Sequence, residues 1–409
     1  MSLKDDAISL HRMLKGKIEI QSRISVENLF EEEKGTLGLI YTPGVAYVSK
    51  EISNNKELVY DYTSKWNNVA IICDGTRVLG LGNVGPEAAI PVMEGKAVLF
   101  KILGGINAFP LCISTQKKDE IIRFVKEIEP IFGAINIEDI ESPKVLEIVE
   151  GLQEILSIPV FHDDQHGTAV ITLAALINSL RIVGKKLEAI KLVIAGAGSA
   201  GYGIVKILYE AGCRDMVVTD SKGALSIDRV DNNKNDDDDT KNQYKLEISQ
   251  KTNPKKLTGN LAHIIEGADV FIGVSGKGGI LNHQMIQSMN HDAIVFALSN
   301  PDPEILPSDA LQGRARIVAT GRSDFPNQIN NAVVFPYVLR VLLDIRAKTL
   351  SQDMLVTVAN AIAGIVNDTH LREDYIIPKV NDPRILATVT KALSDAIQKH
   401  VTKNDYSVA

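Results

Sequence analysis

A glycine-rich turn between an apolar segment and a helical segment constrains the fold of this chain more than any other feature. Leu192–Ala195 has the composition of a buried strand, and the turn that follows it, GAGSAG, opens a helical stretch. In such a turn the first glycine permits a sharp bend, the second lets the backbone approach a pyrophosphate, and the third lets the helix pack against the strand. The next apolar segment, Met216–Thr219, ends at Asp220, where an acid is expected to accept hydrogen bonds from ribose hydroxyls. The alternative is a purely structural turn. The pattern predicts a dinucleotide site at Gly196, Gly198, Ser199, Ala200, Gly201 and Asp220.

The length of 409 residues exceeds what one ordinary hydrophobic core accommodates, so two domains are expected. From residue 69 onward, short aliphatic runs alternate with helix-like stretches, which is typical of parallel βαβ units. We predict an N-terminal α/β domain over residues 1–161 and a Rossmann-type dinucleotide-binding domain with C-terminal helices over residues 162–409. Strands are predicted at 69–73, 108–113, 134–137, 159–161, 192–195, 216–219, 270–274, 294–298 and 317–319, and helices at 166–182, 338–346 and 352–365.

One polar segment interrupts the second domain. Asp231–Tyr244 has the sequence DNNKNDDDDTKNQY and almost no apolar side chain, so it cannot bury a core. We interpret it as a solvated loop that carries no chemistry.

Composition excludes several classes of protein. The formal net charge of −7, with Lys and Arg spread along the chain, gives no basic surface for nucleic acid. The N-terminus lacks an apolar signal region, and no apolar run reaches the roughly 18 residues of a membrane helix. Cys73, Cys112 and Cys213 have neither disulfide-framework nor zinc-site spacing. These features predict a cytoplasmic protein that acts on a small molecule without contacting nucleic acid or membrane.

Acids follow two predicted strands. Glu138 and Asp139 come after one strand, and Asp163 and Asp164 come after another. Since ligands bind at the carboxyl ends of parallel strands, these carboxylates are expected to meet, and they would repel one another unless protonated or bound to a cation. Oxygen ligands suit Mg²⁺ or Mn²⁺. The alternative is that Asp163 or Asp164 caps the helix at 166–182 and that Glu138 and Asp139 are solvated turn acids.

A lysine and an arginine are further candidates in glycine-rich segments. Lys96 lies among apolar residues of a predicted helix, where desolvation would lower its pKa and make it usable as a base. Arg77 lies in the turn after the strand at 69–73. The alternative for Lys96 is a structural lysine whose ammonium reaches water.

The motifs together resemble those of the malic enzyme family, and the resemblance covers nearly the whole chain. They occur in the same order as in the family, and agreement of all of them by chance is not credible. They are YTPGVA at 41–46, DGTRVLGLGNVG at 74–85, PVMEGKA at 91–97, NIED at 136–139, FHDDQHGTA at 161–169, GAGSAG at 196–201, LSNP at 298–301 and ATGRSDFPNQINNAVVFP at 319–336.

The resemblance implies oxidative decarboxylation of malate to pyruvate and CO₂ in an N-terminal catalytic domain, with reduction of NAD or NADP and use of Mg²⁺ or Mn²⁺. It also implies a homodimer. Residue by residue, it makes Lys96 the general base, Tyr41 the general acid, and Asp163 a residue just outside the metal ligands. The implied metal ligands are Glu138, Asp139 and Asp164, and the implied substrate ligands are Arg77, Asn300, which also borders the cofactor, and Asn330, with Asn331 as an equal neighbour. Without the resemblance, Tyr41 and the asparagines would be read as turn or cap residues.

Three other functions remain open at this point. An amino-acid dehydrogenase also pairs a lysine with a Rossmann domain but needs no carboxylate site for a cation. A catalytically silent dinucleotide-binding regulatory protein would bind without turnover, and a malolactic-type enzyme would release lactate.

The choice of dinucleotide depends on Asp220 and its neighbour Lys222. Asp220 disfavours a 2′-phosphate by its charge, whereas Lys222 could accept one. We therefore expect a slight preference for NAD.

Overall fold

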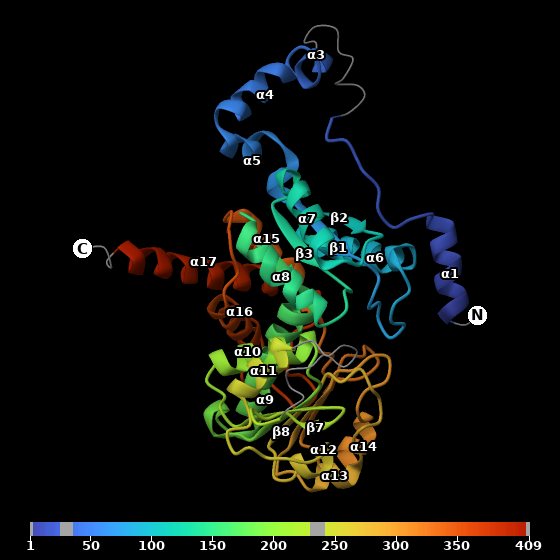
Figure 1. Ribbon diagram of the computed structural model, residues 1–409, viewed down its shortest axis with the longest axis vertical. Helices are drawn as coiled ribbons and strands as arrows, with labels where there is room; N and C mark the ends of the chain where they lie inside the picture. Colours follow the sequence, from blue (N-terminus) through green and yellow to red (C-terminus); the bar gives the residue numbers. More distant parts are fainter. Residues whose placement is uncertain (1–2, 25–35, 230–241, 406–409) are drawn as a thin grey trace.

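The computed structural model describes residues 3–24, 36–229 and 242–405. Two sheets follow one another along the chain, and the second lies at the opposite end of the molecule from the helices at residues 36–54 (Figure 1). The predicted class, an α/β domain followed by a Rossmann-type domain with C-terminal helices, is confirmed. Every predicted strand agrees with the observed one to within a residue at either end.

The first sheet has four parallel strands in the order β2-β1-β3-β4. Strands β1 and β3 are buried at every position, as expected for a parallel sheet covered on both faces. Because the strand order reverses between β1 and β3, the carboxyl ends of these strands flank the switch point where such sheets bind ligands. The elements are β1 (Asn68–Cys73), α6 (Pro86–Gly104), β2 (Asn107–Cys112), α7 (Lys118–Ile128), β3 (Ala134–Ile137), α8 (Lys144–Ile155) and β4 (Val160–His162).

The second sheet has six strands in the order β10-β9-β8-β5-β6-β7, all parallel except β7. Its order reverses between β5 and β8, and the glycine-rich turn follows β5 at this second switch point. Strand β7 has only two residues, too short for a sequence pattern. The elements are β5 (Leu192–Ala195), α10 (Ser199–Glu210), β6 (Met216–Asp220), β7 (Gly223–Ala224), α11 (Gln243–Lys251), α12 (Leu261–Ile264), β8 (Val270–Gly273), α13 (His283–Gln287), β9 (Ile294–Ala297), α14 (Pro307–Gln312) and β10 (Ile317–Thr320).

One helix links the two sheets. A π-helical turn at Asp163–Gly167 leads directly into α9 (Thr168–Val183), which packs against α10 and α16. By length and composition Asp163–Val183 could span a membrane, contrary to the sequence expectation, but 72% of its most apolar window is buried inside the protein. It is the central core helix. The C-terminal helices are α15 (Phe335–Asp344), α16 (Gln352–Ile365) and α17 (Arg384–Asp405).

The N-terminal helices are far less buried than the rest of the chain. They are α1 (Leu3–Leu14), α3 (Thr36–Ile40), α4 (Val45–Asn54) and α5 (Val59–Tyr62). Neither α1 nor α4 has a buried residue, and α3 and α4 extend beyond the first sheet (Figure 1). Their apolar side chains therefore lie at the surface.

The predicted polar loop at 231–244 is wrong at its end. Residues 231–241 lie outside the described residues, but Asn242 accepts a hydrogen bond from the backbone of Lys245 and caps α11. Tyr244 is buried, packs edge-on against Tyr202, and donates to Glu150 at 2.9 Å. Tyr244 and Ile248 both belong to the core and anchor this helix to it.

Gly201→Ala tests the close packing of the glycine turn. A Cβ at position 201 would lie 2.0 Å from the carbonyl oxygen of Gly196, so helix α10 or the turn must shift. We expect a loss of about 1–3 kcal/mol in unfolding free energy, measured by urea denaturation.

Gly364→Ala is the matched control, since Gly364 lies in α16 and a Cβ there would meet nothing within 4 Å. Its expected effect is neutral or stabilising by about 0.5–1 kcal/mol. Equal stability of the two variants would contradict the packing argument.

Candidate active site

The carboxyl ends of both sheets open onto one cavity of about 710 Å³, a size typical of small-molecule sites. Twelve of the predicted site residues line it, and they come from both domains and from the π-turn. The lining residues are Arg77, Lys96, Glu138, Asp139, Asp163, Asp164, Gly198, Ser199, Ala200, Asn300, Asn330 and Asn331. Four predicted residues are not in its lining: Tyr41, Gly196, Gly201 and Asp220.

The glycine turn has the geometry that its sequence predicts. Gly196 has φ +123° and donates its N–H to the carbonyl of Thr219 at 2.9 Å, which ties the turn to β6. Gly201 packs directly on Gly196, so neither residue faces the cavity. A Cβ at Gly198 would meet nothing within 4 Å, so this glycine leaves open space on the cavity side. The start of α10 is therefore accessible to a ligand phosphate.

Lys96 is the most buried cation of the cavity. Its side chain is 8% exposed, and its Nζ donates to Glu138 Oε1 and, at 2.6 Å, to Asp163 Oδ2. Burial lowers the pKa of Lys96, but the two carboxylates outweigh burial and hold that pKa above its usual value. The prediction of a lowered pKa is thus wrong for this arrangement, and the alternative of a lysine that reaches water is also wrong.

The four acids do converge, and their charges perturb one another. Burial, and then the neighbouring carboxylates, raise the pKa of Glu138 well above its usual range. Burial and the charge of Asp164 raise the pKa of Asp139 to about 7. Among the described residues, Asp139 Oδ2 and Asp163 Oδ1 are buried without a hydrogen-bond partner. One lysine is therefore too little positive charge for this cluster.

The capping interpretation of Asp163 and Asp164 is wrong. Gly167 occupies the N-cap position of α9, and no side chain caps either α9 or the π-turn. Both aspartates instead lie within the π-turn, a distortion that is common at functional sites.

The donor set fits a hard divalent cation in its chemistry, because carboxylate oxygens dominate it and two of them are unpartnered. The side chains are not arranged for coordination, however. Within the described parts of the chain, no three His, Cys, Asp or Glu side chains converge on one point that could hold a metal. Instead, Lys96 donates to one oxygen of Glu138.

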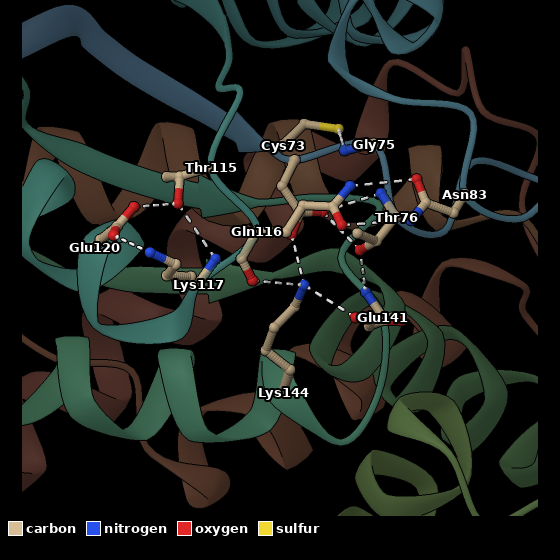
Figure 2. Close-up of polar contacts among 11 residues, drawn as sticks. Cys73, Gly75, Thr76, Asn83, Thr115, Gln116, Lys117, Glu120, Glu141 and Lys144 are labelled. Carbon is tan, nitrogen blue, oxygen red and sulfur yellow. Dashed lines mark hydrogen bonds and ion pairs between the residues drawn. The ribbon is translucent and has the colours of Figure 1, made fainter. Parts of the chain in front are cut away.

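Arg77 is positioned by a buried acid that sequence reasoning missed. Asp74 follows β1 and accepts from the Thr76 backbone at 3.0 Å, from the Thr76 hydroxyl at 2.6 Å and from Lys144 at 2.8 Å. Lys144 reaches from α8 to this turn, where it also contacts Gln116 (Figure 2). Arg77 N–H in turn donates to the carbonyl of Asp139 at 3.1 Å. The Asp-Gly-Thr sequence was the available signal, since Asp commonly accepts from a backbone N–H two residues on.

The three asparagines line the cavity, and Asn330 and Asn331 differ in their contacts. Asn330 Oδ1 accepts from the backbone of Ala332 at 2.8 Å, so it does act as a cap. Asn331 Nδ2 donates to Thr168 at 3.1 Å and to the Asp163 carbonyl at 3.4 Å. The donor group of Asn331 is thus engaged with the π-turn and α9.

A second buried acid supports the nucleotide side of the cavity. Glu304 is fully buried and accepts from the backbone N–H groups of Ser275 at 3.0 Å and Ser299 at 3.1 Å, and from both hydroxyls. It therefore fixes the loops after β8 and β9, including the segment that carries Asn300. Sequence reasoning missed it because its partners are distant in sequence.

Helix α10 also packs directly against the π-turn. A Cβ at Gly203 would lie 2.4 Å from the carbonyl oxygen of Gln165, so the backbones of the two elements are in direct contact. His166 of the same turn is buried, and burial lowers its pKa to about 3. His166 Nδ1 accepts from the backbone N–H of His162 at 3.1 Å, which ties the turn to the end of β4.

Tyr41 is the predicted site residue that the structure does not bring to the cavity. It follows α3 and is 68% exposed. Neighbouring apolar side chains are exposed as well, among them Leu37, Leu39, Ile40, Tyr47 and Val48.

A dinucleotide turn that shares a cavity with a lysine and carboxylates of a second α/β domain defines a two-domain dehydrogenase. The malic enzyme N-terminal domain matches residues 16–153, and the malic enzyme NAD binding domain matches residues 165–401. The chain belongs to the malic enzyme family, and it binds NAD or NADP. The division between residues 161 and 162 stays a prediction.

Individual relatives agree with this assignment. The bifunctional malic/malolactic enzyme of Bacillus subtilis is 47% identical over 396 residues, which cover 97% of this chain and 93% of that protein. The NADP-dependent malic enzyme of Halomonas elongata is 41% identical over an aligned region that covers 90% of this chain and 89% of that protein. The crystal structure of the NAD-dependent malic enzyme of Thermotoga maritima has a TM-score of 0.87 at 45% identity, over 95% of this chain and 98% of that one.

Proposed function

We propose that this chain oxidises malate and decarboxylates the product to pyruvate and CO₂, with reduction of NAD or NADP. The observation that carries this proposal is the cavity shared by Lys96, the carboxylate cluster and the glycine turn. Lys96, the carboxylates and the start of α10 line the same cavity, which supports a lysine base and a cation site beside a bound dinucleotide. The free thiols of all three cysteines support a reducing, cytoplasmic location.

We propose Glu138, Asp139 and Asp164 as the residues that would hold Mg²⁺ or Mn²⁺, and such an ion would supply Lewis acidity at the C2 oxygen of malate. Lys96 would accept the proton of the C2 hydroxyl as hydride leaves C2 for the nicotinamide. It must lose its own proton first. A cation held by Glu138 would compensate part of the carboxylate charge that raises the pKa of Lys96.

Arg77 and the asparagines, which line the same cavity, would orient the substrate carboxylates. Arg77 can form a paired contact with a carboxylate. The amide donors of Asn331 are engaged with Thr168 and Asp163, whereas Asn330 uses only its oxygen among the contacts described. We therefore favour Asn330, together with Asn300, for the substrate.

The activity is tested by supplying malate, Mn²⁺ and each dinucleotide in turn. We expect equal amounts of reduced dinucleotide, pyruvate and CO₂, because one site performs both steps. Lys96→Ala should reduce turnover on the order of 10²–10⁴-fold, the usual contribution of a positioned proton-transfer group.

Lactate release without net dinucleotide reduction would instead support the malolactic reaction, which the name of the Bacillus subtilis relative includes. Binding of dinucleotide without any turnover would support a silent regulatory protein, and activity that persists in chelator would support an amino-acid dehydrogenase. Any of these outcomes contradicts the proposal.

Asp164→Asn separates a metal ligand from a structural acid. An amide oxygen is a poorer ligand than a carboxylate for Mg²⁺ or Mn²⁺, and Asp164 caps no helix whose loss would destabilise the fold. We expect unchanged thermal melting without metal but a much higher Mn²⁺ concentration for half-maximal activity. Glu141→Gln, which changes an exposed acid in the loop before α8 that pairs with Lys144, should leave the Mn²⁺ requirement unchanged. An Asp164→Asn enzyme with normal Mn²⁺ dependence would exclude Asp164 as a ligand.

Tyr41 can act as the general acid that protonates the enolate only if it reaches a cavity. We propose that it does so in a homodimer, by entering the cavity of the second subunit. The exposed apolar residues around Tyr41 support this proposal, because a second copy of the chain would cover them.

Mixed subunits test this arrangement. Tyr41→Phe and Lys96→Ala should each be nearly inactive alone. Co-expressed, the two chains should form heterodimers with one complete site, recovering roughly a quarter of wild-type activity if subunits pair at random. If heterodimers form but remain inactive, the proposal is wrong. Tyr41 would then act in the cavity of its own subunit or take no part in catalysis.

A further inference from the structure

A second cavity lies where residues of α8, α10 and the start of α16 meet the π-turn. It has a volume of about 200 Å³, and its lining includes Gln165 and His166 of that turn. Among the described residues, it shares no lining residue with the active-site cavity. Because pockets for drug-sized ligands are larger, this one suits a molecule of the size of a single amino acid.

Two polar side chains of this lining each have an atom without a protein partner. Gln352 Oε1, at the start of α16, is buried and accepts from no group among the described residues. His166 is 4% exposed, and its Nδ1 accepts from the backbone N–H of His162, so the ring proton is on Nε2. In the part of the chain that the structure describes, Nε2 has no acceptor. A buried donor and a buried acceptor without partners are unfavourable until a ligand satisfies them.

A lysine and a glutamate of the same lining add opposite charges. Lys206 Nζ lies 4.8 Å from the ring centroid of Tyr202 and donates to its hydroxyl at 3.3 Å. No carboxylate pairs with Lys206 within the described ranges. Glu150 accepts from the hydroxyl of Tyr244 at 2.9 Å through one oxygen, Oε2. The cavity therefore presents a cation and an anion to the same ligand.

The rest of the wall is apolar. Leu146 and Val149 are each 2% exposed and lie one turn apart on α8, and Leu350 lies just before α16. A matching ligand has a carboxylate for the cation, a positively charged donor for the anion, and an aliphatic part. A dicarboxylate fits less well, because its second carboxylate would be repelled by Glu150.

We propose that this cavity is a second ligand site, which binds a small aliphatic amino acid and regulates the enzyme. The carboxylate of the ligand accepts from Lys206 and His166. Its ammonium group donates to Gln352 and Glu150, and its side chain packs against the apolar wall. The site lies outside the proposed reaction, and binding there does not depend on that reaction.

Calorimetry on the full-length chain tests binding without turnover. The probe is L-valine, and the two comparison ligands are 3-methylbutanoate, which lacks the ammonium group, and 2-methylpropan-1-amine, which lacks the carboxylate. We expect L-valine to bind at least about tenfold more tightly than either, because each loses its charged hydrogen bonds at one end. Absence of L-valine binding, or equal binding of all three, would overturn the proposal.

Lys206→Met removes the cation that holds the carboxylate of the ligand. We expect affinity for L-valine to fall on the order of 10-fold to 100-fold. Lys251→Met is the matched control, because Lys251 Nζ also lies near a tyrosine ring, 5.4 Å from the centroid of Tyr209, but Lys251 does not line the cavity. An equal loss in both variants would show a general charge effect and contradict the role of Lys206.

Gln352→Met is a second variant should Lys206→Met fail to fold. It removes the unpartnered oxygen at similar side-chain volume, so the ligand-free protein should melt at the same temperature as the wild type or higher. L-valine affinity should nevertheless fall several-fold. Wild-type affinity in this variant would count against the proposed binding mode.

A bound amino acid should also affect the active site, because Gln165 and His166 belong to the same π-turn as Asp164. L-valine should change the dissociation constant of malate, and malate should change that of L-valine by the same factor. Bound L-valine without any effect on malate would overturn the regulatory role. A chain that binds L-valine but does not turn over malate would leave the second site standing and overturn the proposed reaction.

Discussion

Four carboxylates line the cavity around one buried lysine, which pairs with two of them, and much of the site depends on that imbalance of charge. Lys96 comes from α6, Glu138 from the end of β3, and Asp163 from the π-turn between the sheets. Their contacts join three separate elements at the point where both domains meet. Removing one partner from a buried ion pair typically costs about 3–5 kcal/mol, so this cluster resists any change in its geometry. The negative charges of the cluster nevertheless outnumber its positive charge. Among the described residues, the buried Oδ2 of Asp139 and Oδ1 of Asp163 have no hydrogen-bond partner.

The fold could be predicted from the sequence because its signals are local. Strands of a parallel sheet are short aliphatic runs, and Leu192–Ala195 and Ala134–Ile137 were located to the residue for this reason. The roles of Gly196, Gly198 and Gly201 also follow from spacing alone, since each position has one steric requirement. Tyr244 shows the limit of such reasoning. Polarity predicted a loop, but one aromatic contact with Tyr202 placed the start of α11 in the core.

The sequence predicted which residues form the site, but it did not predict which of them contact one another. Lys96, Glu138 and Asp163 are far apart in sequence, so the direction of the Lys96 pKa shift depended on contacts that no motif specifies. The same holds for Asp220, whose residue type favoured NAD but whose contacts with Arg229 and Lys245 follow from no motif. Asp163 is a third case. A helix followed it as predicted, but the π-turn gave it an ion pair with Lys96 instead of a cap.

The backbone contact between Gly203 and Gln165 makes the two halves of the cavity thermodynamically linked. Helix α10 starts at the phosphate-facing turn, and the element it touches carries Asp163 and Asp164. Because Gly203 packs this closely on Gln165, we expect a ligand that shifts one element to shift the other as well. Dinucleotide and substrate should therefore change each other's affinity by the same factor, whichever arrives first. Cooperativity of this kind needs neither a hinge nor a second subunit, only a glycine at position 203.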